Sequence, residues 1–372
     1  MKDKSLGIKR LWVLVLFPLG LIILGAASRI EAFRDIYTKT VYPFMSGALN
    51  YLFSMTDISI AQIIIVVFAA VIVFYTVVTI LSIIFRPEKL KKIFSFAVNL
   101  ICLFSIVFFL FCVTCGINYH RKSFAEEEGI TIEKSSVSEL AALYEDLVTR
   151  TNAARAEFGG KYRSFKENAL LAEEFVEALA EKYPSLSGDY GPPKAVNFFG
   201  WMSFTQITGF FFPFTYEANV NDTAPPVSLP ATMCHELAHV RGHMREDEAN
   251  YIAYLTCVCS GDPEFVYSGL MLALAHTSSA LYAESPDTYR DLSAKLDDAV
   301  KKDISDKNDY WKKYNGVIAD ISDTVNDIYL KANTQADGVK SYGKMVDLLL
   351  AEYRHKNQNN ETGFSEEKTD EN

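Results

Sequence analysis

Three long apolar segments without a charged side chain constrain this chain more than any other feature of its sequence. They cover about residues 11–28, 60–84 and 93–115. A helix needs about 20 apolar residues to cross a bilayer, and helices that are apolar on every side are unfavourable in water. The sequence therefore predicts three transmembrane helices within a membrane domain that covers residues 1–122.

The first apolar segment has two interpretations. Basic residues precede it, and the small residues Ala26 and Ala27 end it, which is typical of a cleaved signal peptide. It is, however, rather long for the apolar core of a signal peptide, and two further apolar segments follow it. We therefore expect a retained membrane anchor.

Basic residues in the short flanking segments predict the orientation of these helices. Lys and Arg accumulate in cytoplasmic loops. Here four of them precede the first apolar segment, and four more lie between residues 86 and 92. We therefore expect a multi-pass protein of the cell membrane with a cytoplasmic N-terminus. Residues 29–59, and everything after about residue 116, should then lie on the outer side.

The part of the chain after residue 122 is strongly acidic. It holds 23 Lys and Arg against 41 Asp and Glu, a formal charge of −18. A surface of this sign repels phosphate backbones, so we expect no nucleic-acid partner. Its cysteines, Cys234, Cys257 and Cys259, do not indicate a disulfide framework, and we expect all three to be small core residues.

Helical patterns dominate the predicted extracytoplasmic domain, residues 123–355. Ser136 and Glu139 match a capping box, and apolar residues follow at helical spacing. A second helix is expected from about Phe165 to Tyr183, where Pro184 ends it. Later periodicities predict helices over about 263–282, 287–300, 317–332 and 339–354. The polar segment 356–372 is predicted to be a disordered acidic tail.

Residues 195–221 differ from the rest of this domain. They are rich in aromatic and β-branched residues and contain Pro213, which indicates short strands, some of them at an edge. An edge strand beside a catalytic helix can pair with an extended peptide. A hairpin that only completes the core is the alternative. The expected fold is thus mainly α, in an α+β arrangement with a small edge sheet.

The sequence HELAH at residues 235–239 matches the H-E-x-x-H pattern of zinc enzymes. Two histidines four residues apart share one face of a helix, so His235 and His239 can bind one Zn²⁺ ion. Glu236 would then face the water that the metal activates, and would act as the general base. A solvated helix face without a metal is the alternative interpretation.

A catalytic zinc site usually has three protein ligands. Glu246, Glu248 and His243 are the candidates for the third. Gly242 permits the chain to turn and bring a second helix back, and a helix that begins near residue 245 places Glu246 and Asn250 on one face. Glu246 is therefore our preferred ligand, and Asn250 would orient it from behind.

Several longer segments resemble a bacterial membrane family catalogued as domain of unknown function 3810, within the zincin-like group. They are GINYHR at 116–121, GFFFPFTYEANVN at 209–221, HELAHVRGHMREDEAN at 235–250, and NDIYLKAN and DGVKSYGKMVDLLL near the C-terminus. The site is also similar to that of gluzincin peptidases, in which a Glu followed by two residues and then by Ala-Asn or Ala-Asp is the third ligand; Glu246 has this spacing to Ala249 and Asn250. This resemblance implies a zincin-like fold and again favours Glu246. The interval after His239 is shorter than in better-known gluzincins.

Two functions are compatible with these residues. The first is a membrane-anchored zinc metalloendopeptidase that acts on peptide or protein substrates outside the cytoplasm. The second is a non-catalytic membrane receptor or scaffold that retains a structural metal. Cleavage within the membrane is disfavoured because the motif lies about 120 residues beyond the third apolar segment. The oxyanion donor that a peptidase needs remains open among Tyr216, Tyr267, His276 and Tyr329.

Overall fold

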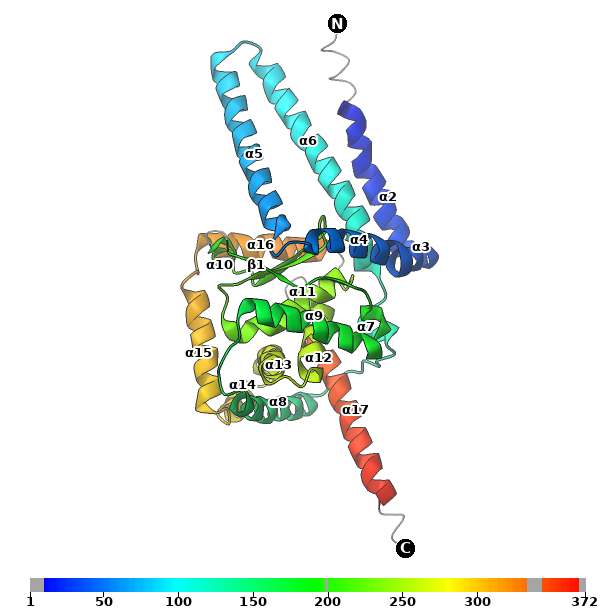
Figure 1. The fold of residues 1–372 in the computed structure, drawn as a ribbon, viewed down its shortest axis with the longest axis vertical. Coiled ribbons are helices and arrows are strands. Elements are labelled where there is room, and N and C mark those ends of the chain that lie inside the picture. The colour runs from blue at the N-terminus through cyan, green and yellow to red at the C-terminus, as the bar shows by residue number, and fades with distance from the viewer. Residues whose placement is uncertain (1–9, 198–199, 333–342, 368–372) are drawn as a thin grey trace. The chain divides into compact units, whose positions relative to one another are not determined.

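The computed structural model describes residues 10–197, 200–332 and 343–367, and these residues are mostly helical (Figure 1). The chain divides into two compact units. The first comprises residues 1–121 together with the short segment Phe212–Glu217, and the second comprises Lys122–Phe211 and Ala218–Asn372. The structure of the second unit positions the predicted metal site.

Three helices of the first unit are long and apolar enough to cross a membrane. The first begins as a 3₁₀ turn, η1, and continues as α2; the bounds are η1 Arg10–Val15, α2 Leu16–Arg29, α5 Ile60–Phe85 and α6 Lys89–Thr114. These three helices confirm the three predicted apolar helices. The third begins four residues earlier than expected, because Lys89, Lys91 and Lys92 are good helix formers that extend it.

Polar side chains join these three helices. Arg10 donates a hydrogen bond from Nη1 to Asn99 Oδ1 at 2.8 Å, and Asn99 Nδ2 donates to the Tyr75 hydroxyl at 2.7 Å. Hydrogen bonds between apolar helices help to fix their packing. The segment between the first two spans is helical too, in α3 Glu31–Ile36, the π-helix η2 Tyr37–Val41 and α4 Tyr42–Ser54.

The short segment Phe212–Glu217, which connects two strands of the sheet described below, belongs to this first unit. The carboxylate of Glu217 accepts hydrogen bonds from the backbone N–H groups of Ile60 (3.1 Å) and Ala61 (2.7 Å), at the first turn of α5. The Tyr216 hydroxyl donates to the carbonyl of Thr114, the last residue of α6, at 3.0 Å. A carboxylate at a helix N-terminus satisfies free N–H groups and interacts favourably with the helix dipole.

The second unit is built from helices that surround a buried hairpin of helices, α11 and α12. Three of its helices begin with a complete capping box, in which Ser123, Ser136 and Ser164 pair with the Glu three residues later; the prediction at Ser136 is therefore confirmed. The helices are α7 Phe124–Glu127, α8 Val137–Phe158, α9 Phe165–Lys182, α10 Trp201–Phe204, α11 Leu229–Val240, α12 Glu246–Cys259, α13 Pro263–Glu284, α14 Pro286–Ser293, α15 Asp298–Lys312, α16 Val317–Ala332 and α17 Gly343–Glu367.

Three sequence expectations require correction. The single helix expected over 287–300 is two helices, because the chain turns at residues 294–297, where Asn152 accepts a hydrogen bond from Asp297 N and donates one to Lys295 O. Helix α17 continues to Glu367, through much of the predicted tail, and residues 368–372 lie outside the described residues. Cys234 and Cys257 are buried as expected, but Cys259, on the outer side of α12, is exposed.

The predicted short strands form one three-stranded sheet. Its strands are β1 Lys194–Val196, β2 Gly209–Phe212 and β3 Glu217–Asn221, in the order β1-β3-β2. β1 and β3 are parallel, with Ala195 opposite Val220. β2 is an edge strand, and Pro213 lies in the turn after it, where its missing N–H costs no ladder hydrogen bond.

Candidate metal centre

Helix α11 carries the histidine pair and is held on both sides by the core. Met233, Leu237 and Val240 form its buried apolar face, which packs with side chains of α9, β3 and α13. Burial of each such side chain stabilises the folded state by roughly 1.5–3 kcal/mol relative to its exposure to water. The rigid helix places His235 and His239 on one face, with ring centroids 4.6 Å apart and planes at 89°.

A backbone N–H group in the first turn of α11 forms its hydrogen bond with a residue that is distant in the sequence. Ser268, on α13, accepts a hydrogen bond from Ala231 N at 3.1 Å and donates to Val227 O at 2.7 Å. Ser228, the residue before the helix, makes no side-chain cap. The start of α11 is therefore fixed by a tertiary contact with α13 rather than by a local capping box.

A tight turn after α11 brings the third candidate ligand back. His243 N bonds to Ala238 O at 3.2 Å and Gly242 N to His239 O at 2.9 Å, the two bonds of a Schellman motif. Gly242 has φ +87°, which only glycine adopts without strain. After three intervening residues α12 begins, with Glu246 as its first residue.

This turn brings Glu246 against both histidines. One Glu246 carboxylate oxygen lies 3.3 Å from His235 Nε2, and the other lies 3.6 Å from His239 Nε2. The ligand atoms of all three residues lie within 4.8 Å of one another. In a tetrahedral zinc site with bonds of about 2.0–2.2 Å, neighbouring ligand atoms are about 3.3–3.6 Å apart. The set of two imidazoles and one carboxylate therefore fits Zn²⁺.

The two other candidates for the third ligand point elsewhere. Glu248 bonds to Arg245 Nη1 at 2.6 Å and lies 3.8 Å from His243 Nδ1. The His243 ring packs edge-on against Phe124, with centroids 5.6 Å apart. Of the three, only Glu246 reaches the histidine pair. Its role as a zinc ligand stays a prediction.

A backbone carbonyl orients His239. His239 Nδ1 lies 2.7 Å from His243 O, so Nδ1 donates to this carbonyl and Nε2 faces Glu246. Burial lowers the pKa of His239, but Glu246 raises it more strongly, to about 9. Burial raises the pKa of Glu246, but hydrogen bonds to the two histidines and their positive charges lower it more strongly. The net pKa of Glu246 therefore lies well below the usual value. A metal ion that bound here would therefore have to displace a proton from this pair.

Glu236 lies next to the cluster without belonging to it. Only 3% of the residue is exposed, and within the described chain its Oε2 atom has no hydrogen-bond partner. Burial raises the pKa of Glu236 to about 7, although the charges of His235 and His239 oppose this shift. A carboxylate whose pKa lies near neutrality can both accept and return a proton.

Strand β2 begins directly against this carboxylate. A Cβ atom at Gly209 would lie 2.5 Å from Glu236 Oε1 and 2.8 Å from its Cγ. Glycine is thus required here by close approach, and the backbone of the edge strand lies beside the predicted general base. No local sequence pattern indicates this contact, because 27 positions separate the two residues.

A sequence family described as a protein of unknown function, DUF3810, matches residues 37–350. The chain belongs to the DUF3810 family. No curated protein and no solved structure matches it. The matched range includes every residue of the His/Glu cluster, but the family description assigns no activity, so a function for this DUF3810 protein must be argued from its own residues.

Two of the four candidate oxyanion donors in this DUF3810 chain are engaged elsewhere. The Tyr216 hydroxyl donates to Thr114 O, and the Tyr267 hydroxyl donates to Asp303 Oδ2 at 2.8 Å. Burial and, to a smaller extent, the positive charges of Lys307 and His235 lower the pKa of His276 to about 4. His276 is therefore within electrostatic range of the cluster. The side chain of Tyr329 lies outside the described residues.

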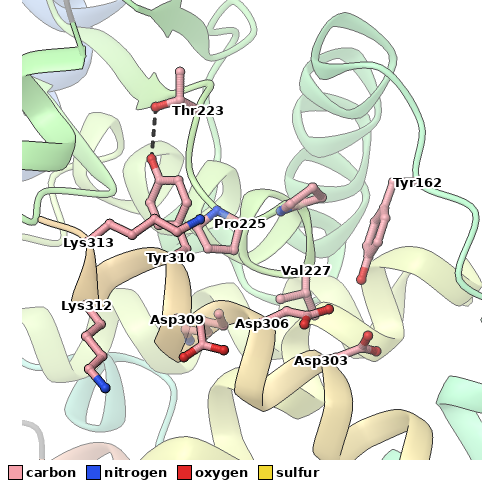
Figure 2. A pocket seen from close by; sticks show the side chains of 12 residues that line it. Tyr162, Thr223, Pro225, Val227, Asp303, Asp306, Asp309, Tyr310, Lys312 and Lys313 are labelled. Carbon is pink, nitrogen blue, oxygen red and sulfur yellow. Dashed lines mark hydrogen bonds between the residues drawn. The ribbon is translucent and has the colours of Figure 1, made fainter.

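Asn250, the predicted orienting residue, lies one turn after Glu246 on α12 and is buried. Its role toward Glu246 stays a prediction. A cavity of about 810 Å³ lies away from the candidate ligands, between α15 and the segment that joins β3 to α11. Figure 2 shows its mixed lining, with Thr223 hydrogen-bonded to Tyr310 at 3.0 Å. No residue of the His/Glu cluster lines it.

Proposed function

We propose that this protein is a zinc metallopeptidase, anchored in the cell membrane by three helices, that hydrolyses peptide or protein substrates outside the cytoplasm. One observation carries the proposal. A buried carboxylate, Glu236, lies beside an assembled cluster of His235, His239 and Glu246, the residue set that zinc hydrolases use.

The reaction divides between the metal and the protein. When bound, Zn²⁺ would supply an electrophile that polarises the scissile carbonyl and acidifies a water molecule. Glu236 would take a proton from that water as its oxygen adds to the carbonyl carbon. It would then give this proton to the amide nitrogen as the C–N bond breaks, which yields a carboxylate and an amine.

The edge strand supplies a surface on which an extended peptide can bind. In the described sheet β2 lies at an edge, next to β3, and an extended peptide can pair with an edge strand. Gly209 at its start lies beside Glu236. A peptide that pairs with β2 would therefore extend toward the general base. We propose extended peptide segments as the substrate class.

Metal analysis of the full chain in detergent tests the site. We expect one zinc per chain in the wild type, and loss of zinc in His239→Ala and Glu246→Ala. Glu248→Ala is the matched control, because Glu248 lies on the same turn but bonds to Arg245. A correctly folded wild-type chain that binds no stoichiometric metal would contradict the proposal.

Glu236→Gln separates a peptidase from a receptor or scaffold that only retains a metal. The amide keeps the size of the side chain but cannot accept the proton, and such transfers contribute about 10²–10⁴-fold to rate. We expect zinc to stay bound while hydrolysis of an unstructured protein substrate falls by at least about 10²-fold. A wild-type chain that binds zinc but cleaves none of a broad set of peptides would favour the scaffold.

A further inference from the structure

Helix α16 leaves an apolar stripe uncovered. The stripe consists of Val317, Ile318, Ile321, Val325 and Ile328, and between 57% and 73% of each residue is exposed. At 3.6 residues per turn these five positions fall within an arc of about 100°. Single exposed apolar residues are ordinary, but a continuous stripe indicates a surface that binds something apolar.

The helix is attached to the rest of the second unit by its other side and its beginning. Ala319 is buried. Just before the helix, the Tyr314 ring packs edge-on against Phe204 at 5.1 Å, and Asn315 Oδ1 accepts a hydrogen bond from Gln206 Nε2 at 2.7 Å. Phe204 is itself 47% exposed, and it lies at the end of α10. The stripe therefore belongs to a helix whose start is held in place by these contacts.

We propose that the α16 stripe binds the lipid surface of the membrane that anchors the chain. Its chemistry favours lipid over protein, because it has only Val and Ile, whereas protein hot spots are enriched in Trp, Tyr and Arg. A helix with one apolar and one charged face is the form that lies flat at a bilayer interface. The other faces of α16 carry three acidic residues, Asp320, Asp323 and Asp327, and one basic residue, Lys331, which pairs with Asp327.

The length of the connecting chain supports this choice. α6, the third apolar helix, ends at Thr114, and the second unit begins at Lys122. The seven residues between them reach at most about 25 Å when fully extended. If α6 crosses the bilayer, the second unit stays near its surface, at a high effective concentration of lipid.

Lipid-borne quenchers test the proposal on the full chain in nanodiscs. The exposed Cys259 is first replaced by Ser, so that a fluorophore attaches only to an introduced cysteine. Ile321→Cys and Val325→Cys place a bimane label on the stripe, and Asp323→Cys places it on the opposite side as the matched control. The nanodiscs contain phosphatidylcholine with a minor share of phosphatidylglycerol, with brominated or ordinary acyl chains.

We expect brominated chains to reduce the emission from positions 321 and 325 about twofold or more, because interfacial helices bury their apolar face about 5–10 Å deep. Emission from position 323 should hardly change. Equal emission in both lipids at all three positions overturns the proposal and points to a protein partner or a second copy of the chain. Equal quenching at all three positions also overturns it. Each labelled protein must keep the thermal midpoint of its unlabelled parent.

Discussion

At the scale of single residues, the proposed chemistry depends on close packing around Glu236. The residue is almost fully buried, and it is the backbone of Gly209, not a side chain, that lies against its carboxylate. A general base must be held in position to work, since a displacement of about 1 Å can cost about 10²-fold in rate. Gly209 is therefore as informative about the site as the predicted metal ligands themselves.

Gly209→Ala should impair catalysis and leave the metal bound. The new Cβ would lie 2.5 Å from Glu236 Oε1, so the carboxylate must move, while His235, His239 and Glu246 are untouched. We expect unchanged zinc content and a loss of about 10-fold or more in kcat/KM. Gly47→Ala is the control, because nothing lies within 4 Å of a Cβ at that position. Wild-type activity in Gly209→Ala would argue that Glu236 is not the base.

At the scale of elements, long-range polar contacts fix where several helices begin. Asp262 accepts hydrogen bonds from Glu264 N (3.0 Å) and Phe265 N (3.2 Å) at the start of α13, and it also pairs with both terminal nitrogens of Arg163. Burial raises the pKa of Asp262, but the hydrogen bonds from Arg163 and the helix lower it more, so the net pKa is depressed. The cap joins the start of α13 to the segment before α9.

Asp262→Asn should therefore destabilise the protein in a pH-dependent way. A carboxyl whose pKa is depressed on folding stabilises the native state above its unfolded pKa, near 3.8, and this stabilisation is lost as the pH falls through the folded value. At pH 7 we expect a loss of about 1–3 kcal/mol, seen as a lower thermal midpoint. The difference from wild type should shrink below about pH 4.

The exposed pair of Asp287 and Arg290 supplies the control for this experiment. The Asp287 side chain is 90% exposed, and a surface ion pair contributes little. Asp287→Asn should therefore leave the thermal midpoint unchanged at every pH. An Asp262→Asn deficit that stays constant down to pH 3 would show that the carboxylate charge is not the cause.

The cap of α5 makes a second prediction at this scale. Glu217 accepts two backbone hydrogen bonds there and a third, at 2.7 Å, from the Thr215 hydroxyl. Glu217→Gln loses one acceptor and the charge, so we expect a loss of about 1–2 kcal/mol, measured as lower thermal stability of the full chain in detergent. Glu88→Gln, at an exposed pair with Lys91, should have no effect. Equal stability of both variants would contradict the capping role.

At the scale of the whole molecule, the predicted orientation rests on basic residues alone, so it needs its own test. The exposed Cys259 provides one, because the other five cysteines are buried. A membrane-impermeant maleimide should label intact spheroplasts if the second unit lies outside the cytoplasm. Partial desolvation by neighbouring residues raises the pKa of the exposed Cys259 thiol, so labelling should be faster above neutral pH.

Two controls make this labelling decisive. Cys259→Ser should abolish the signal, and lysed cells should give the full signal in either orientation. Labelling that appears only after lysis would place the second unit in the cytoplasm. That outcome would exclude substrates outside the cell and leave the His/Glu cluster itself unaffected.

The sequence by itself determined the features that depend on local periodicity. Three apolar runs, the capping box at Ser136 and the spacing of His235 and His239 are all visible within one or two helical turns. A 3.6-residue repeat is enough to place two imidazoles on one face. An uninterrupted apolar run of this length likewise makes a helix that is apolar on every side.

The sequence favoured Glu246 over Glu248, but only the tertiary structure shows which carboxylate reaches the histidines. Glu246 and Glu248 are two residues apart, and the direction in which α12 leaves the turn at Gly242 selects between them. Likewise, the contact of Gly209 with Glu236 and the cap of α11 by Ser268 join residues that are far apart in sequence. Such contacts follow from how whole elements pack, and no local pattern encodes them.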